Sequence, residues 1–195
     1  MPPRKKPETR IIVPAPNLKV MRVGIKGLSP LLVNRWSEKA MRQIEETQSG
    51  APKTRKRAAR DPRAEFEASS YRYPGGGYGF PSASFRLAAV SACRLVDGLT
   101  MTQARVLFVI PADLVKLVGP RPKMDTRPVR LANGSADLRY RALFWPWATK
   151  LDIRYNANAV SAEQIINLLV LAGECIGVGE LRPEKGGNHG RFTIK

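Results

Sequence analysis

The C-terminal segment, residues 177–195 (GVGELRPEKGGNHGRFTIK), constrains the fold more than any other part of the sequence. A helix-like apolar run precedes it, a strand-like run closes it, and five glycines lie between. Glycine adopts positive φ at little cost and lets another stretch of backbone come close. The segment therefore predicts a long loop between the last helix and a terminal strand. Its cations Arg182, Lys185 and Arg191, beside glycine amides, predict phosphate contacts.

The charge of the chain indicates its partners. Lys and Arg number 33 against 16 Asp and Glu, a formal net charge of +17. Nucleic acid is the commonest polyanion met by such a surface, since binding releases counterions from the phosphates. An anionic membrane surface is the competing explanation, but no basic amphipathic helix is visible. A ribosomal or purely charge-neutralising role stays open.

Composition also excludes several classes. Two cysteines and one histidine do not make the usual structural zinc site, and we expect no metal or other cofactor. Cys93 and Cys175 lie in apolar helix-like runs, which predicts small buried thiols. No signal peptide or membrane-spanning run is visible, so we expect a cytoplasmic protein without membrane contact.

The apolar pattern predicts an α+β fold. It favours strands and helices in the following order: a strand at 18–28, helices at 37–48, 61–71 and 82–95, strands at 106–110 and 114–118, a hairpin of 138–145 with 148–155, a helix from the capping box at 161–164 to 173, and a strand at 191–195. This order is compatible with a βαββαβ ferredoxin-like or RNA-recognition-type antiparallel sheet. Helices would cover one face, and a large insertion would follow the first strand.

Two segments are expected to lie outside the packed core. Residues 1–16 are rich in proline and basic residues, which predicts a flexible arm before a single domain at 17–195. Residues 49–63 hold six basic residues against one aspartate, which predicts a mobile insertion. It would either fold over a bound strand or act as a disordered solubilising loop. Its candidate contacts are Lys53, Arg55, Lys56, Arg57 and Arg60.

Two segments also resemble a known family. Residues 27–32 (GLSPLL) after the first strand, and the glycines from 177 to 190 followed by Arg191 and Phe192, resemble the RAMP superfamily that forms the backbone of CRISPR effector complexes. The pattern departs from the usual spacing, with Asn188 and His189 between two of the glycines. The PLLVNRWSEKA and RPEKGG segments also resemble a group of short bacteriophage proteins, and a phage-encoded protein would be expected in the bacterial host cytoplasm.

The resemblance to the RAMP superfamily implies a ferredoxin-like fold and binding of single-stranded RNA or DNA along a groove. It also implies homo-oligomers that assemble head to tail into a helical filament.

Aromatic and basic residues elsewhere extend the candidate nucleic-acid site. Tyr71, Tyr73 and Tyr78 flank a glycine tip and are candidates for stacking on bases, although such rings also pack at core edges. The remaining candidates for backbone contacts are Arg35 and Lys39 on one helix face, and Arg139, Arg141 and Arg154 on an open sheet face. Ordinary surface charge is the alternative for these five residues.

His189 raises the question of catalysis. It could act as a general acid or base in a metal-independent endoribonuclease, but no second titratable group has an obvious partner spacing. We therefore expect a non-enzymatic protein that binds single-stranded RNA or DNA, mainly through the phosphate backbone. The alternatives are the endoribonuclease and a phage protein-interaction module that mimics a CRISPR backbone subunit.

Overall fold

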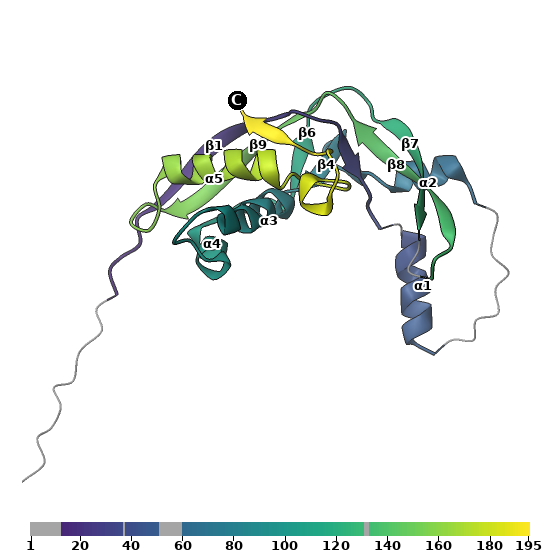
Figure 1. The fold of residues 1–195 in the computed structure, drawn as a ribbon, viewed down its shortest axis with the longest axis horizontal. Coiled ribbons are helices and arrows are strands. Elements are labelled where there is room, and N and C mark those ends of the chain that lie inside the picture. The colour runs from purple at the N-terminus through teal and green to yellow at the C-terminus, as the bar shows by residue number, and fades with distance from the viewer. Residues whose placement is uncertain (1–12, 37, 51–59, 131–132) are drawn as a thin grey trace, which may run out of the picture.

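The structure is a computed structural model that describes residues 13–36, 38–50, 60–130 and 133–195 (Figure 1). Most of the predicted arm and most of the predicted basic insertion lie outside the described residues. The candidate contacts in that undescribed part are Lys53, Arg55, Lys56 and Arg57.

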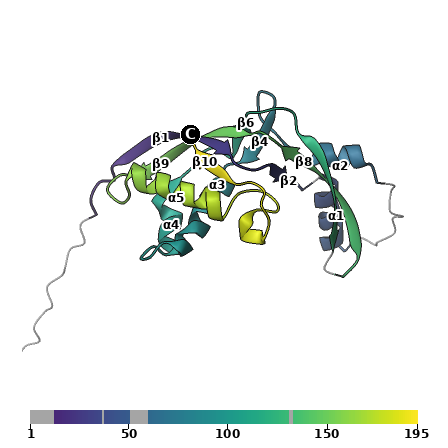
Figure 2. The ribbon, with the colours of Figure 1, turned by 45° about the horizontal axis from the view of Figure 1, so that its top comes forward.

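A four-stranded antiparallel sheet is the centre of the fold. Its strand order is β10 (Phe192–Ile194), β1 (Leu18–Gly27), β9 (Ala148–Asn156) and β5 (Phe108–Val109). Helices α3 (Ala83–Ala92) and α5 (Ala162–Cys175) cover one face of this sheet, as Figures 1 and 2 show. The six elements follow one another as βαββαβ, so the predicted α+β ferredoxin-like fold is confirmed.

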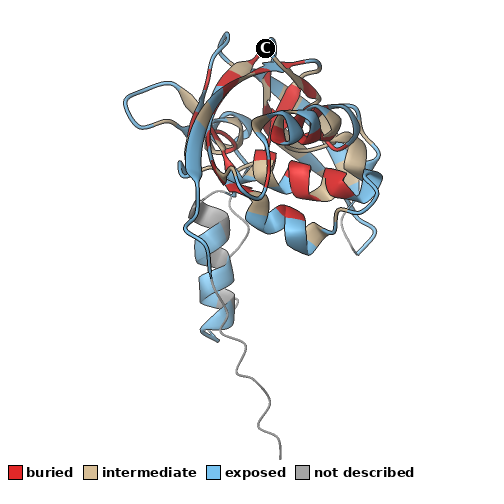
Figure 3. Cartoon of the chain, turned by 90° about the vertical axis from the view of Figure 1, so that its left-hand side faces the viewer, coloured by how far each residue is buried: buried red, intermediate tan, exposed pale blue. Residues whose placement is uncertain are grey.

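The core lies between this sheet and the two helices. In β1, Val23 and Ile25 are buried and alternate with polar or small residues, and Leu151 and Ile153 do the same in β9. Phe85 of α3 is fully buried and meets the rings of neighbouring aromatics edge to face. Burying one such side chain stabilises the fold by about 1.5–3 kcal/mol. Figure 3 shows the buried faces of the helices turned inward.

Two insertions build two further sheets. One sheet has the order β2 (Leu31–Val33), β8 (Ala136–Phe144) and β7 (Lys123–Arg130), and the other has the order β3 (Tyr71–Arg72), β4 (Tyr78–Pro81) and β6 (Leu114–Leu117). The first insertion follows β1, as predicted. The second lies between β5 and β9 and contributes β6, β7 and β8.

The predicted hairpin of residues 138–145 with 148–155 is wrong. β9 already has a strand on each edge, β1 on one side and β5 on the other. β8 instead pairs with β7 and β2 in the neighbouring sheet. The sequence did not indicate β7, because its segment KMDTRPVR is polar and contains a proline.

The remaining helices partly match the prediction. α1 (Glu38–Gln48) is present, and Asp61 caps α2 (Pro62–Ala68) by accepting from two backbone amides. α2 ends before Tyr71, which belongs to β3, and α4 (Met101–Leu107) replaces the first half of the predicted strand at 106–110. Cys93 is buried, but Cys175 is exposed.

In the described part of the chain, two short 3₁₀ turns lie between the longer elements. Short 3₁₀ turns follow α3 as η1 (Cys93–Leu95) and lie in the C-terminal loop as η2 (Pro183–Lys185). Within the described ranges, no helix has both the length and the apolar character needed to cross a membrane.

Gly173 provides a test of the packing between α5 and β10. A Cβ at this position would lie 1.9 Å from the carbonyl oxygen of Phe192. Helix propensity alone predicts that Gly173→Ala stabilises the protein by about 1 kcal/mol. We expect destabilisation by about 2 kcal/mol or more, measured by chemical denaturation, because the strand must move away. A gain in stability would contradict this packing.

Candidate nucleic-acid interface

The face of the four-stranded sheet opposite the helices carries a row of cations. The register of β1 with β9 pairs Val20 with Arg154, Arg22 with Asp152, Gly24 with Lys150, and Lys26 with Ala148. Each of these four cross-strand pairs holds one cation, and all four cations are exposed. Same-face pairs follow one another every 6.8 Å or so along antiparallel strands. The result is a row of about 20 Å, here called the cation row, whose members alternate between β9 and β1.

One member of the cation row is neutralised. Arg22 donates two hydrogen bonds, of 2.6 and 3.0 Å, to the Asp152 carboxylate. These hydrogen bonds and the charge of Arg22 outweigh desolvation and hold the pKa of Asp152 below its ordinary value. Within the described residues, Lys26, Lys150 and Arg154 form no ion pair. They are the row's available charges.

Further residues extend this surface. Lys195 is exposed, and its Cβ lies 3.5 Å from where a Cβ of Gly24 would be, which places it beside the cation row. Leu18, Val20 and Val109 leave 52%, 68% and 45% of their surface exposed on the same face. The surface therefore combines positive charge with exposed aliphatic groups.

Arg139 and Arg141 do not join Arg154 on one face, which corrects the prediction. They belong to β8, in the sheet with β2 and β7, whereas Arg154 belongs to β9. Arg139 pairs with Asp137 at 2.9 Å. Arg141 is buried, and its Nη1 lies 3.9 Å from an oxygen of Glu180. Two of the three predicted arginines thus lie elsewhere with acidic neighbours.

The glycines of the C-terminal loop serve close packing. The amides of four of them donate hydrogen bonds within the chain, to Ala172, Arg182, Pro183 and Pro30. Gly190 has φ 67°, and a Cβ there would lie 1.7 Å from the carbonyl oxygen of Val178. Few glycine amides of the loop therefore point to an outside ligand. Their spacing is explained by the fold of the loop itself.

Two of the three predicted loop cations are paired. Arg182 donates to Glu184 at 2.9 and 3.0 Å, and Arg191 donates to Glu174 of α5. Burial raises the pKa of Glu184, but hydrogen bonds from Ser91 and Arg182 outweigh it, so that its net pKa is lowered. Lys185 is exposed, and within the described residues it has no ion pair.

The three tyrosines have different surroundings. Tyr71 and Tyr73 are half-buried, with a cation 5.9 Å from each ring centroid: the guanidinium of Arg35 for Tyr71 and the ammonium of Lys116 for Tyr73. Tyr78 packs edge to face on Phe144 at 5.2 Å and has the Arg72 guanidinium 4.7 Å from its centroid. Tyr78 is thus the least available of the three for stacking.

Three further candidates lie away from the cation row. Arg35 precedes α1 and hydrogen-bonds through its backbone to Ser69, so its predicted shared helix face with Lys39 does not form. Lys39 lies in α1. Arg60 pairs with Glu65 at 2.6 Å and with Asp137, which raises the pKa of its guanidinium and joins α2 to β8.

His189 is held as a neutral imidazole. The Arg127 guanidinium lies 3.3 Å from its Nε2, and arginine can only donate, so Nε2 accepts. Burial, and then the charge of Arg127, lower the pKa of His189, against a smaller opposite effect of Asp125. In the described part of the chain, no cluster of three or more His, Cys, Asp or Glu side chains could hold a metal.

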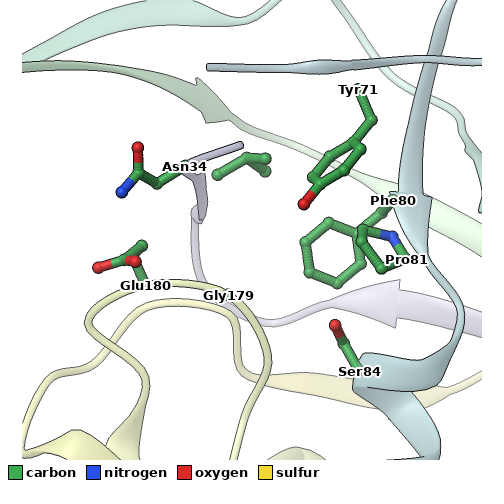
Figure 4. A pocket seen from close by; sticks show the side chains of 8 residues that line it. Asn34, Tyr71, Phe80, Pro81, Ser84, Gly179 and Glu180 are labelled. Atoms are coloured by element: carbon green, nitrogen blue, oxygen red, sulfur yellow. The ribbon is translucent and has the colours of Figure 1, made fainter. Parts of the chain in front are cut away.

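A pocket lies between the C-terminal loop and the β3–β4–β6 sheet (Figure 4). It has a volume of about 150 Å³ and is lined by Val33, Asn34, Tyr71, Phe80, Pro81, Ser84, Gly179 and Glu180. Several of these residues lie in segments that the sequence analysis noted, but no pattern joins them, because the eight come from four separate segments.

Comparison with known proteins finds only a distant likeness in fold. No protein-family model matches the chain, and no curated protein matches it. Among solved structures 36 chains match, one of them in the crystal structure of Cmr6 from Pyrococcus furiosus. That chain is 10% identical, with a TM-score of 0.44 over 91% of this chain and 99% of Cmr6. A likeness at this level transfers no function or partner.

The single histidine makes the pH dependence of stability easy to assign. The pKa of His189 is lower in the folded state than in the unfolded state, where it is near 6.5. The free energy of unfolding is therefore highest above pH 6.5 and falls as the pH drops below that value. The loss is at most about 1.4 kcal/mol per pH unit.

We expect His189→Gln to remove most of the difference in unfolding free energy between pH 7.5 and pH 5.5, measured by urea denaturation. An unchanged pH dependence in the variant would show that His189 titrates normally in the folded protein.

Proposed function

We propose that this chain is a RAMP-like protein that binds single-stranded RNA or DNA without enzymatic turnover. The observation that carries the proposal is the cation row, because a series of positive charges along two paired strands suits a linear polyanion. Neutralising successive phosphates releases counterions, which supplies most of the affinity of such contacts. Assembly along the strand, which the family resemblance implies, remains a prediction.

The aliphatic side chains beside the cation row favour a single strand over a duplex. Leu18, Val20 and Val109 are exposed on this face. Unpaired bases expose apolar ring surfaces that can cover such groups, whereas a duplex keeps its bases stacked inside. The backbone would follow the cations while some bases lie against the aliphatic groups.

The absence of turnover rests on the surroundings of His189. Its Nε2 accepts from Arg127, and the acidic group that affects its pKa is Asp125, which is itself paired with Arg127 at 2.9 Å. A general base needs a free nitrogen within reach of the reacting hydroxyl. We therefore place His189 in the structural support of the loop.

A protein partner is the second candidate function, and the surface of α1 favours it. Trp36 lies just before this helix and is 63% exposed. Met41 and Ile44 lie on the helix and are 41% and 39% exposed. Grouped exposed apolar residues are typical of protein-binding surfaces. A partner that stays bound after nuclease treatment, and is lost in Met41→Ser with Ile44→Ser, would support this alternative.

The cation row predicts a change in the salt dependence of binding. Replacing Lys26, Lys150 and Arg154 by glutamine removes the three unpaired cations. We expect weaker binding to a short single-stranded oligonucleotide, and a slope of log K against log salt that is smaller by about 2. Fluorescence anisotropy over a salt series measures both quantities.

A matched control removes the same charge from other parts of the surface. Arg42 of α1, Arg105 of α4 and Arg121 before β7 are exposed. Replacing these three by glutamine should leave the slope nearly unchanged. Equal losses in the two triple variants would contradict a binding role specific to the cation row.

A further inference from the structure

The pocket beside the C-terminal loop has the form of a small, shallow ligand site. Its floor is apolar, since Val33 and Phe80 are 1% and 3% exposed. Its rim is partly exposed and polar, with Asn34 and Glu180 on one side and Tyr71 on the other (Figure 4). A volume of about 150 Å³ is below the range of sites for whole drug-sized molecules. It suits a single flat ring.

Several polar groups at the rim lack a protein partner. In the described part of the chain, the side chains of Asn34, Tyr71 and Ser84 form no hydrogen bond with another residue, and neither does the Gly179 amide. Figure 4 shows the hydroxyls of Tyr71 and Ser84 turned toward the space between the walls. Polar groups that converge on an apolar floor are typical of a site that orients a ligand.

The charge of the pocket selects the kind of ligand. Glu180 is its acidic group, and its carboxylate can only accept hydrogen bonds when ionised. Arg141 lies behind it, at 3.9 Å, and is 8% exposed. The Nε of this arginine is, among the described residues, a buried side-chain donor with no partner. A carboxylate in this place repels phosphate and attracts N–H donors.

One wall offers an aromatic surface. Tyr71 lines the pocket, and the guanidinium of Arg35 lies 5.9 Å from its ring centroid. Phe80 lies below it and is held edge to face by Phe85 at 5.8 Å. Rings fixed in this way serve as platforms for an unpaired base, at about 1–3 kcal/mol per stacked base.

We propose that the pocket takes one unpaired nucleobase of the bound strand, and that Glu180 selects guanine. Guanine presents an imino and an amino N–H side by side, so one carboxylate can accept from both. Adenine and cytosine present an amino group alone, and thymine or uracil presents a single imino group. This inference rests on the proposed function, because it assigns a base-reading role to a protein that otherwise contacts phosphates.

The test compares oligothymidylates that differ at one central position, which carries dT, dG, dC or dA. We expect the strand with dG to bind at least about fivefold more tightly than the strand with dT, the range of a good bidentate contact. Glu180→Gln should reduce this ratio to near one, and Tyr71→Phe should reduce it partly. Anisotropy titrations at fixed salt measure the ratios.

The control is Glu163→Gln on α5, which removes the same negative charge and should keep the preference for dG. Equal affinity for the four strands, or a preference that survives Glu180→Gln, would overturn the assignment of the pocket while leaving the cation row intact. Failure of all these strands, and of the corresponding oligouridylate RNA strands, to bind would overturn the proposed function itself.

Discussion

The pairing of β1 with β9 is the interaction on which the rest of the structure depends. The two strands pair in register from Leu18 with Asn156 to Lys26 with Ala148. One face of the pair gives Val23, Ile25, Leu151 and Ile153 to the core, and the other face carries the cation row. Because side chains alternate with period two, a slip of one residue would exchange the two faces. The core therefore fixes the position of the cations.

The C-terminal loop connects this sheet with the pocket. The Gly190 amide donates to Pro30, and the Glu180 amide donates to Leu32, so the loop is tied to the chain on either side of the turn into β2. These contacts place Gly179 and Glu180 at the rim of the pocket. The loop that looked like a phosphate-binding segment in the sequence is better understood as the piece that shapes the pocket.

The sequence predicted the fold better than the site. The capping box of Ser161 at α5 and the apolar alternation of β1 contain the information locally, so an order compatible with βαββαβ could be derived. The pairing of β8 with β7 could not, because it depends on which edges of β9 are already occupied. Lys150 and Asp152 alternate with buried residues as Arg154 does, so the exposed face of β9 is encoded in its local pattern.

The pocket illustrates what a sequence pattern cannot supply. Asn34, Tyr71, Ser84 and Glu180 come from four elements or loops, and tertiary packing alone brings them together. The pairing of Arg191 with Glu174 was equally hidden, because the two residues are 17 positions apart in the sequence and come together only through tertiary packing. Counts of loop charges consequently overstated the charge available to a ligand.

The most direct measurement of the central claim is photo-crosslinking of the purified protein to a single-stranded oligonucleotide, with the modified peptides identified by mass spectrometry. If the cation row binds the strand, the crosslinks fall on the strands β1 and β9 and on residues beside them. Crosslinks confined to α3 and α5, on the opposite face of the sheet, would contradict it.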